Sequence, residues 1–237
     1  MQTSRNPGPQ SPASYAEQYI IDNIWQDVYP PGAKLPGERD LAQHIGVTRP
    51  TLREALQRLA RDGWVTIHHG RPTVVNEFWK TGGLNLLLTL SRRQGATTLN
   101  LLKQALDVRL VLGPEFIARA IDHDPERVVQ QLELLEQLEE GPETYANFDW
   151  EYNHCLSVAT GNPIFTLIIN GLQSLYHLLA IHYFAYPDTR RAAKTHWQKQ
   201  LAAFRQQDKQ AALANNESYT ELATQRWLEI AADIPQI

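Results

Sequence analysis

The chain has 237 residues, of which 43% are hydrophobic and 20% charged, and its formal net charge is −4 at pH 7. This composition is ordinary for two globular domains and excludes an extensively disordered protein. The single cysteine, Cys155, excludes an intramolecular disulfide, and the longest apolar runs fall short of the roughly 20 residues that cross a bilayer. We therefore expect a cytoplasmic protein without a signal peptide or a membrane segment.

Three helices are predicted in the first quarter of the chain. Apolar residues recur at helical spacing between Tyr15 and Val28, until the run YPPG stops the pattern. A second helix is expected between Pro36 and Gly46, and a third between Thr48, a good N-cap, and Gly63. The apolar positions of these helices should form a core, and they are Tyr15, Tyr19, Ile20, Ile24, Val28, Leu41, Ala42, Ile45, Leu52, Ala55, Leu56 and Leu59.

The period of the pattern changes after Gly63. Residues 64–68 alternate like a strand, residues 69–72 have turn chemistry and residues 73–75 are β-branched, which together predict a short β-hairpin. After Asn76 the pattern is helical, with breaks near Thr97, Asp124-Pro125, Gly141-Pro142, Gly161-Asn162-Pro163 and Tyr186-Pro187.

The expected fold is mainly α. Residues 1–76 should form a winged helix-turn-helix of three helices and a small β-hairpin, which binds DNA. Residues 77–93 should form a linker helix, and residues 94–237 an all-α bundle of six to seven helices.

Positive charge gathers in the third helix and the hairpin. Between Arg49 and Arg71 the chain has five arginines and two acids, whereas the surplus of acids lies beyond residue 76. Arg49 and Arg53 lie one turn apart, away from the leucine stripe, so they should face outward together. A guanidinium can bind both guanine O6 and N7 in the major groove, which makes these two residues candidates for base recognition.

Further candidates surround this pair. Thr48 and Thr51 can donate hydrogen bonds to phosphate at the positive end of the third helix, and Arg39 can contact the backbone across the groove. The remaining candidates are in the hairpin, where Gly70 permits close approach to the adjacent minor groove, and they are His69, Gly70 and Arg71. The alternative is that the arginines form a solvated helix face and the hairpin is a structural cap, and the pattern alone leaves both open.

Residues 30–76, PPGAKLPGERDLAQHIGVTRPTLREALQRLARDGWVTIHHGRPTVVN, resemble the winged-helix domain of the GntR family of regulators. The resemblance implies DNA contacts at Arg39, Thr48, Arg49, Thr51, Arg53, His69, Gly70 and Arg71. Pro50, also a predicted contact position, stands where the regulators it resembles have a DNA-contacting threonine, so one contact is expected to differ.

The segments SPASYAEQYIIDNIW, NEFWKTGGLN, ATGNPIF and HYFAYP resemble members of this family that govern fatty-acid metabolism. The resemblance implies a homodimer that binds double-stranded operator DNA, represses β-oxidation genes and activates unsaturated fatty-acid synthesis genes. It also implies release from DNA by long-chain fatty acyl-CoA, with this effector ligand and no cofactor.

The ligand is expected in the helical domain. Tyr176 and Tyr183 lie seven residues apart on one helix face, and Arg109 lies inside an otherwise apolar run, which suits a cavity with aromatic walls and one cation. The resemblance adds the last helix, where Thr220 and Ala223 replace the Gly and Ser of relatives and the tryptophan, Trp227, is retained. The full expected set is Arg109, Tyr176, Tyr183, Tyr219, Thr220, Ala223 and Trp227. The alternative is that the aromatic residues pack a core and that Arg109 pairs with a carboxylate.

No metal is expected. Relatives with such a helical domain often bind a metal through an Asp and three His, beginning with the spacing D-x-x-x-H. Here Asp149 is followed at that spacing by Asn153, and Trp197 stands where another histidine is expected. The histidines of this half should then be surface or core residues, and they are His154, His177, His182 and His196.

No catalytic residues are expected either. Cys155 adjoins His154, but neighbouring side chains on a helix diverge, so they cannot form a dyad. The chain has no phosphate-binding motif of the Walker A or GxGxxG type. The alternatives that stay open are a GntR-family regulator responding to a small organic acid, an acyl-CoA hydrolase, and an interaction module that does not bind DNA.

Overall fold

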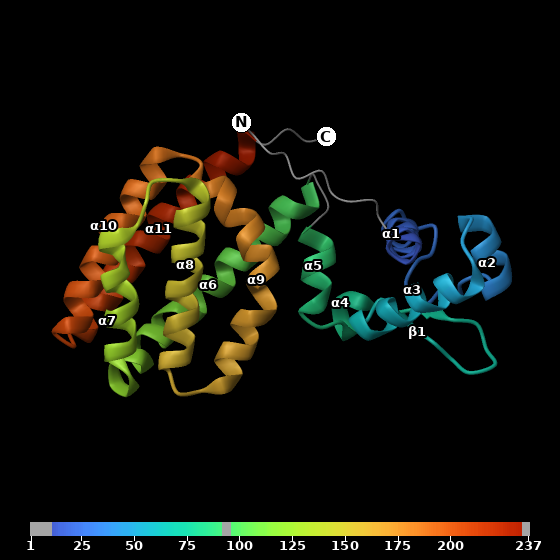
Figure 1. Cartoon of the computed structure of the whole chain (residues 1–237), viewed down its shortest axis with the longest axis horizontal. Coiled ribbons are helices and arrows are strands. Elements are labelled where there is room, and N and C mark those ends of the chain that lie inside the picture. Colours follow the sequence, from blue (N-terminus) through green and yellow to red (C-terminus); the bar gives the residue numbers. More distant parts are fainter. Residues whose placement is uncertain (1–10, 92–95, 234–237) are drawn as a thin grey trace. The chain divides into compact units, whose positions relative to one another are not determined.

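The computed structural model describes residues 11–91 and 96–233. The chain divides into two compact units between Leu86 and Leu87 (Figure 1). The mainly α fold is confirmed, with helices throughout and one small antiparallel sheet. Among the described helices, none is long and apolar enough to span a membrane.

The N-terminal unit contains the predicted helix-turn-helix and hairpin. Gly46 and Gly63 end the second and third helices with φ of 82° and 93°, a left-handed conformation that glycine adopts without strain. The hydroxyl of Thr48 accepts a hydrogen bond of 3.3 Å from the amide of Thr51, as an N-cap does. The elements are α1 (Pro12–Trp25), α2 (Glu38–Ile45), α3 (Arg49–Asp62), β1 (Val65–Thr66), β2 (Val74–Val75) and α4 (Phe78–Thr81).

The predicted core stripes of α2 and α3 are confirmed, because all seven of their apolar residues are buried. The prediction for α1 was wrong at its two ends. This helix stops at Trp25, and the chain turns at Asp27, which has a positive φ of 61°, so Val28 is exposed; Tyr15 also faces solvent. The predicted core residues Ile20 and Ile24 are buried, and the buried face of α1 is completed by Ala13, Ala16 and Ile21.

The hairpin is held against the end of α3. Strand β1 pairs antiparallel with β2 through Val65 and Val75, and the amide of Leu35 donates a 2.8 Å hydrogen bond to the carbonyl of Thr73. Asn76 joins the sheet to the helix: its side chain donates to the carbonyl of Gly63 at 3.0 Å. It also accepts a 2.7 Å hydrogen bond from the hydroxyl of Thr66. The wing therefore has a fixed base below its exposed loop.

The expected linker helix is two short helices in the structure. Helix α4 ends at Thr81 and α5 (Asn85–Ser91) begins after two consecutive glycines, of which Gly82 is extended, with φ of −76° and ψ of 158°. Glycine disfavours a continuous helix because it has the most backbone freedom to lose. Residues 92–93 of the predicted linker lie outside the described residues, as does the stretch just before the predicted break at Thr97.

The C-terminal unit is helical throughout its described residues, and four predicted breaks are confirmed because α7, α8, α9 and α10 each begin with a proline. A further break after α10 was not predicted. It contains neither glycine nor proline, and Gln207 takes a positive φ of 52° there. The elements are α6 (Ala96–His123), α7 (Pro125–Glu133), the 3-10 helix η1 (Leu134–Gln137), α8 (Pro142–Ala159), α9 (Pro163–Phe184), α10 (Pro187–Arg205) and α11 (Lys209–Asp233).

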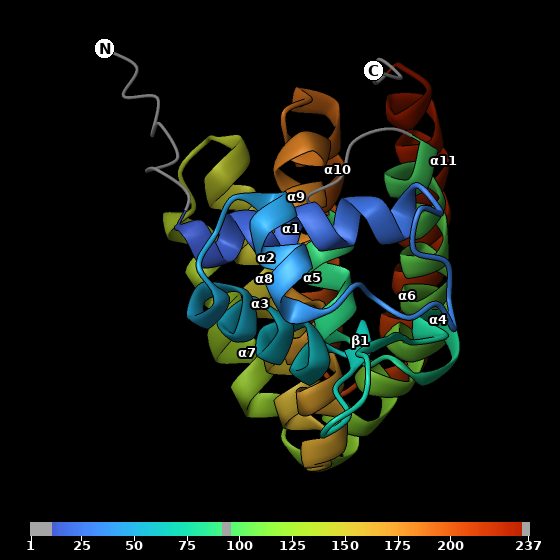
Figure 2. The ribbon, with the colours of Figure 1, turned by 90° about the vertical axis from the view of Figure 1, so that its right-hand side faces the viewer.

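Large aromatic side chains form the core of this unit. Trp197 of α10 is fully buried between Tyr145 and Phe148 of α8, with ring centroids 5.7 and 4.6 Å away. Helix α8 packs along α9, and α11 packs along both α6 and α10 (Figures 1 and 2). This arrangement surrounds the middle of α6 with helices α8, α9 and α11.

His196 gives this core a pH dependence. The ring is buried and stacks on Tyr219, with centroids 4.2 Å apart, and burial, reinforced by the charge of Arg109, lowers the pKa of His196 to about 3. An unfolded histidine takes up a proton below about pH 6.5, so the folded state should lose up to about 1.4 kcal/mol of unfolding free energy per pH unit below that value.

Between about pH 6.5 and pH 5, the unfolding free energy of His196→Gln should decrease less per pH unit than that of the wild-type protein. Urea denaturation at each pH measures this free energy. His182→Gln, at an exposed position of α9, should keep the wild-type slope and serves as the control. An unchanged slope in His196→Gln would contradict the assignment of this proton to His196.

Candidate functional site

The outward face of α3 carries the residues predicted to read DNA. Arg49, Pro50 and Arg53 are all exposed, on the side of the helix opposite its buried leucines. Within the described part of the chain, Arg49 has no hydrogen bond or ion pair. Thr48 and Thr51 lie at the N-terminus of the same helix, where amide groups and helix dipole favour an anion.

Arg53 has a protein partner but remains accessible. Its Nε lies 2.7 Å from a carboxylate oxygen of Glu38 on α2, yet 63% of its side chain is exposed. Surface ion pairs of this kind contribute at most about 1 kcal/mol, less than a good bidentate contact with guanine. The contact therefore orients Arg53 without removing it from solvent.

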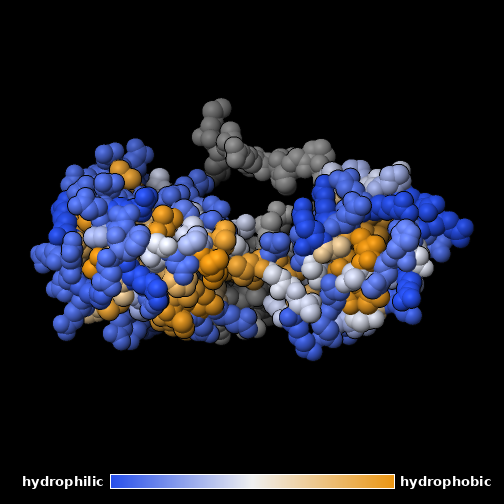
Figure 3. All heavy atoms as spheres, turned by 90° about the horizontal axis from the view of Figure 1, so that it is seen from below, coloured by the Kyte–Doolittle hydropathy of each residue, from blue (hydrophilic) through white to orange (hydrophobic). Residues whose placement is uncertain are grey.

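The other predicted DNA contacts lie at the ends of α2 and the wing. Arg39 is in the first turn of α2, exposed, with its Nε 3.1 Å from Asp40. His69, Gly70 and Arg71 are exposed in the loop between β1 and β2, where Gly70 takes a positive φ of 69°. The structure thus places all three groups of predicted contacts at the surface of one small unit, whose face in Figure 3 has hydrophilic side chains around a hydrophobic area.

Sequence reasoning missed two residues that position these groups. Glu38 orients Arg53, and Asn76 fixes the base of the wing. Arg53 lies 15 residues from Glu38, and Asn76 lies 13 from Gly63, so no helical or strand period links either pair. Only the packing of α2 on α3, and of the hairpin on the end of α3, brings them together.

A cavity of about 120 Å³ lies inside the C-terminal unit, between α6, α8, α9 and α11. Its walls are mostly apolar, and they include Leu106, Leu112, Phe116, Trp150, Leu172, Leu175 and Leu179. Four of the predicted ligand residues line it: Arg109, Tyr176, Tyr183 and Trp227. Apolar walls with few polar groups are typical of a small-molecule site.

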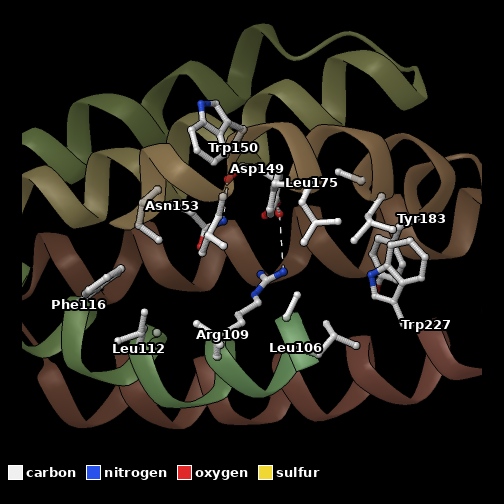
Figure 4. A pocket seen from close by; sticks show the side chains of 18 of the residues that line it. Leu106, Arg109, Leu112, Phe116, Asp149, Trp150, Asn153, Leu175, Tyr183 and Trp227 are labelled. Carbon is white, nitrogen blue, oxygen red and sulfur yellow. Dashed lines mark hydrogen bonds and ion pairs between the residues drawn. The ribbon is translucent and has the colours of Figure 1, made fainter. Parts of the chain in front are cut away.

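Arg109 points into this cavity from α6 and faces Asp149 of α8 (Figure 4). Its Nη1 lies 3.8 Å from Asp149 Oδ2, and the hydroxyl of Tyr176 donates a hydrogen bond to that same oxygen. Asp149 is 2% exposed and the Arg109 side chain 24%. Burial raises the pKa of the Asp149 carboxyl, and the charge of Arg109 opposes this effect.

The guanidinium of Arg109 keeps unused hydrogen-bonding capacity. The Asp149 carboxylate, 3.8 Å away, is beyond hydrogen-bond distance. The guanidinium also lies over the ring of Tyr219, whose centroid is 5.7 Å away. No other described residue accepts a hydrogen bond from it. In Figure 4 Arg109 lies between Leu112 and Phe116 on one side and Tyr183 and Trp227 on the other. A ligand acceptor could therefore bind midway along an apolar cavity.

The other three predicted ligand residues lie elsewhere. Tyr219, Thr220 and Ala223 are buried in α11 and do not line the cavity. Tyr219 packs between His196 and Arg109, and the hydroxyl of Thr220 donates to the carbonyl of Asn216 at 2.7 Å. Two cavity residues were considered only as metal ligands from the sequence, namely Asp149 and Asn153.

The chemistry around Asp149 does not suit a metal. Among the described residues, no group of three His, Cys, Asp or Glu side chains lies close enough to hold one. Asp149 faces a guanidinium, which would repel a cation, and the neighbouring Trp197 offers no lone pair. Cys155 is a weak nucleophile and a weak metal ligand, because burial raises the pKa of its thiol to about 11.

The buried pair supports a stability prediction. Arg109→Met leaves Asp149 buried without its counter-charge, and such losses cost about 3 to 5 kcal/mol. Adding Asp149→Leu should recover most of that free energy of unfolding, measured in urea. Arg205→Met, which breaks the exposed pair with Glu133, should cost less than about 1 kcal/mol. Additive losses in the double variant would show that the two charges do not interact.

Both parts of the chain match models of known protein families. The model of bacterial regulatory proteins of the gntR family matches residues 12–75, and that of the FadR C-terminal domain matches residues 76–237. The fatty acid metabolism regulator protein of Erwinia tasmaniensis is 48% identical over 192 residues, which cover 81% of either chain. That of Cronobacter sakazakii is 47% identical over 184 residues, 78% of this chain and 77% of the other.

A solved structure has the same fold at low identity. It is that of Lar, which is described as controlling the expression of the Listeria monocytogenes agr system. Its TM-score is 0.57 at 17% identity, with 94% of this chain and 99% of the other covered. The two family matches and the relatives mean that the chain belongs to the GntR family of bacterial regulatory proteins, in the group that carries the FadR C-terminal domain.

Proposed function

We propose that this protein regulates genes of fatty-acid metabolism, binding palindromic operator DNA as a homodimer and releasing it when long-chain acyl-CoA enters the helical unit. The relatives are named fatty acid metabolism regulators. The observation that carries the proposal is the apolar cavity of the C-terminal unit, with one inward guanidinium whose N–H groups are unused. At β-oxidation genes the bound protein would repress, and at unsaturated fatty-acid synthesis genes it would activate.

In the proposed complex with DNA, α3 lies in the major groove. Arg49 and Arg53 read base edges there, because they are exposed on the face opposite the buried leucines. The wing loop reaches the minor groove, and the phosphate contacts come from Arg39, Thr48 and Thr51. Pro50 has no hydroxyl to donate, so its contact with the duplex is apolar.

In the proposed complex with ligand, the acyl chain enters the cavity and its carbonyl accepts a hydrogen bond from Arg109. The walls favour a long acyl chain over a small organic acid, because a small acid carries several polar groups and the cavity offers mainly leucine and aromatic side chains. Tyr176, Tyr183 and Trp227 form aromatic parts of that wall. The CoA moiety would remain outside the cavity.

Ligand and operator are coupled if they favour different arrangements of the protein. By linkage, each then weakens the binding of the other by the same factor. The two short helices α4 and α5 connect the units, so they are the proposed route of this coupling. The dimer follows from the symmetry of a palindromic site, which two recognition helices read together.

The DNA half of the proposal is tested on a duplex that the wild-type protein selects from random sequence. Arg49→Ala and Arg53→Ala should each weaken specific binding by about 1 to 3 kcal/mol, read by fluorescence anisotropy at fixed salt. Arg61→Ala is the matched control, because Arg61 is exposed at the far end of α3 and pairs with its neighbour Asp62. Wild-type affinity in both test variants would contradict the docking.

The sensing half is tested by adding oleoyl-CoA to that complex. We expect oleoyl-CoA to release the duplex. The concentration of oleoyl-CoA that releases half of the duplex should rise in Arg109→Met, because the ligand carbonyl then loses its hydrogen-bond donor. Free CoA is the control and should leave the anisotropy unchanged. If oleoyl-CoA fails to release the duplex while a short dicarboxylic acid succeeds, the organic-acid alternative replaces the proposal.

A further inference from the structure

The cavity of the C-terminal unit contains two opposite charges that cancel. Among the described residues that line it, Arg109 and Asp149 are the ones that carry charge. His196, the other basic side chain close to Arg109, is kept neutral by burial, which lowers its pKa to about 3. A ligand entering this space meets a site whose net charge is zero.

Asp149 is fixed in place. It lies in the middle of α8 between Phe148 and Trp150, both buried, and it is itself 2% exposed. The hydroxyl of Tyr176 on α9 donates to the oxygen that faces Arg109. The carboxylate therefore cannot turn to solvent when a ligand arrives, and it continues to neutralise the guanidinium.

The head group of a ligand decides whether this arrangement is favourable. A thioester or amide carbonyl can accept an unused N–H of Arg109 without adding charge. A free carboxylate at the same place would put a second negative charge beside Asp149 in an apolar cavity, where like charges repel strongly. With Asp149 present, the site thus distinguishes two head groups on the same acyl chain.

We propose that Asp149 is a specificity-determining residue that makes the cavity select acyl chains with a neutral carbonyl head group and reject the corresponding free fatty acids. This inference rests on the proposed function, which supplies the acyl chain. It assigns to the acidic partner of the pair a role in choosing the ligand, in addition to its role in keeping Arg109 buried.

The first test uses the wild-type protein and three ligands with one acyl chain: oleoyl-CoA, oleamide and oleate. Binding is followed by the fluorescence of Trp150 and Trp227, which line the cavity, below the concentrations at which the ligands form micelles. Oleamide should bind at least about tenfold more tightly than oleate, because the two ligands share the acyl chain and differ in the charge of the head group. Equal affinities would overturn the inference.

The second test replaces the charge and keeps the shape. In Asp149→Asn the side-chain oxygen can still accept from Tyr176, while Arg109 loses its counter-charge. The ratio of oleate affinity to oleamide affinity should rise at least about tenfold over wild type. Asp122→Asn, which removes an exposed carboxylate paired with Lys209, should leave the ratio unchanged.

The outcomes separate the two proposals. If oleoyl-CoA and oleamide both fail to bind the wild-type protein, the proposed function fails and the inference falls with it. If they bind and the ratio stays the same in Asp149→Asn, the inference alone is wrong. If Asp149→Asn does not fold, the ratio of oleamide to oleate affinity in the wild-type protein decides.

Discussion

The C-terminal unit depends on one interaction, the pairing of Arg109 with Asp149 inside an apolar cavity. A guanidinium is costly to bury alone, and here a carboxylate 3.8 Å away offsets part of that cost without taking up its hydrogen bonds. Tyr176 holds the carboxylate and Tyr219 lies beside the guanidinium. The result is a cation that is stable in the free protein and still able to bind a neutral acceptor.

The N-terminal unit uses arginine in the opposite way. The buried leucines of α3 and the apolar residues of α2 form a rigid base, and Arg49 and Arg53 extend from it into solvent. Glu38 orients Arg53 with a pair that is weak enough to be replaced by a base or a phosphate. The exposed arginines of α3 and the buried Arg109 thus occupy separate units of one chain.

Local signals made much of the fold predictable. Glycine after α2 and α3, the Thr48 cap and a proline at the start of four later helices each act within a few residues, and all lie where the pattern indicated. The turn at Gln206–Asp208 has no such signal, and the exposure of Val28 follows from a turn at Asp27. The site was harder to predict, because Arg109 and Asp149 are 40 residues apart and meet only when α6 packs against α8.

The central claim is that Arg109 receives the carbonyl of an acyl ligand while Asp149 continues to neutralise it. A crystal structure of the protein with oleoyl-CoA tests this most directly. We expect the acyl chain between α6, α8, α9 and α11, with the thioester oxygen about 3 Å from a nitrogen of Arg109 and Asp149 still facing the guanidinium. An acyl chain outside this cavity, or a thioester with no contact to Arg109, would contradict the account.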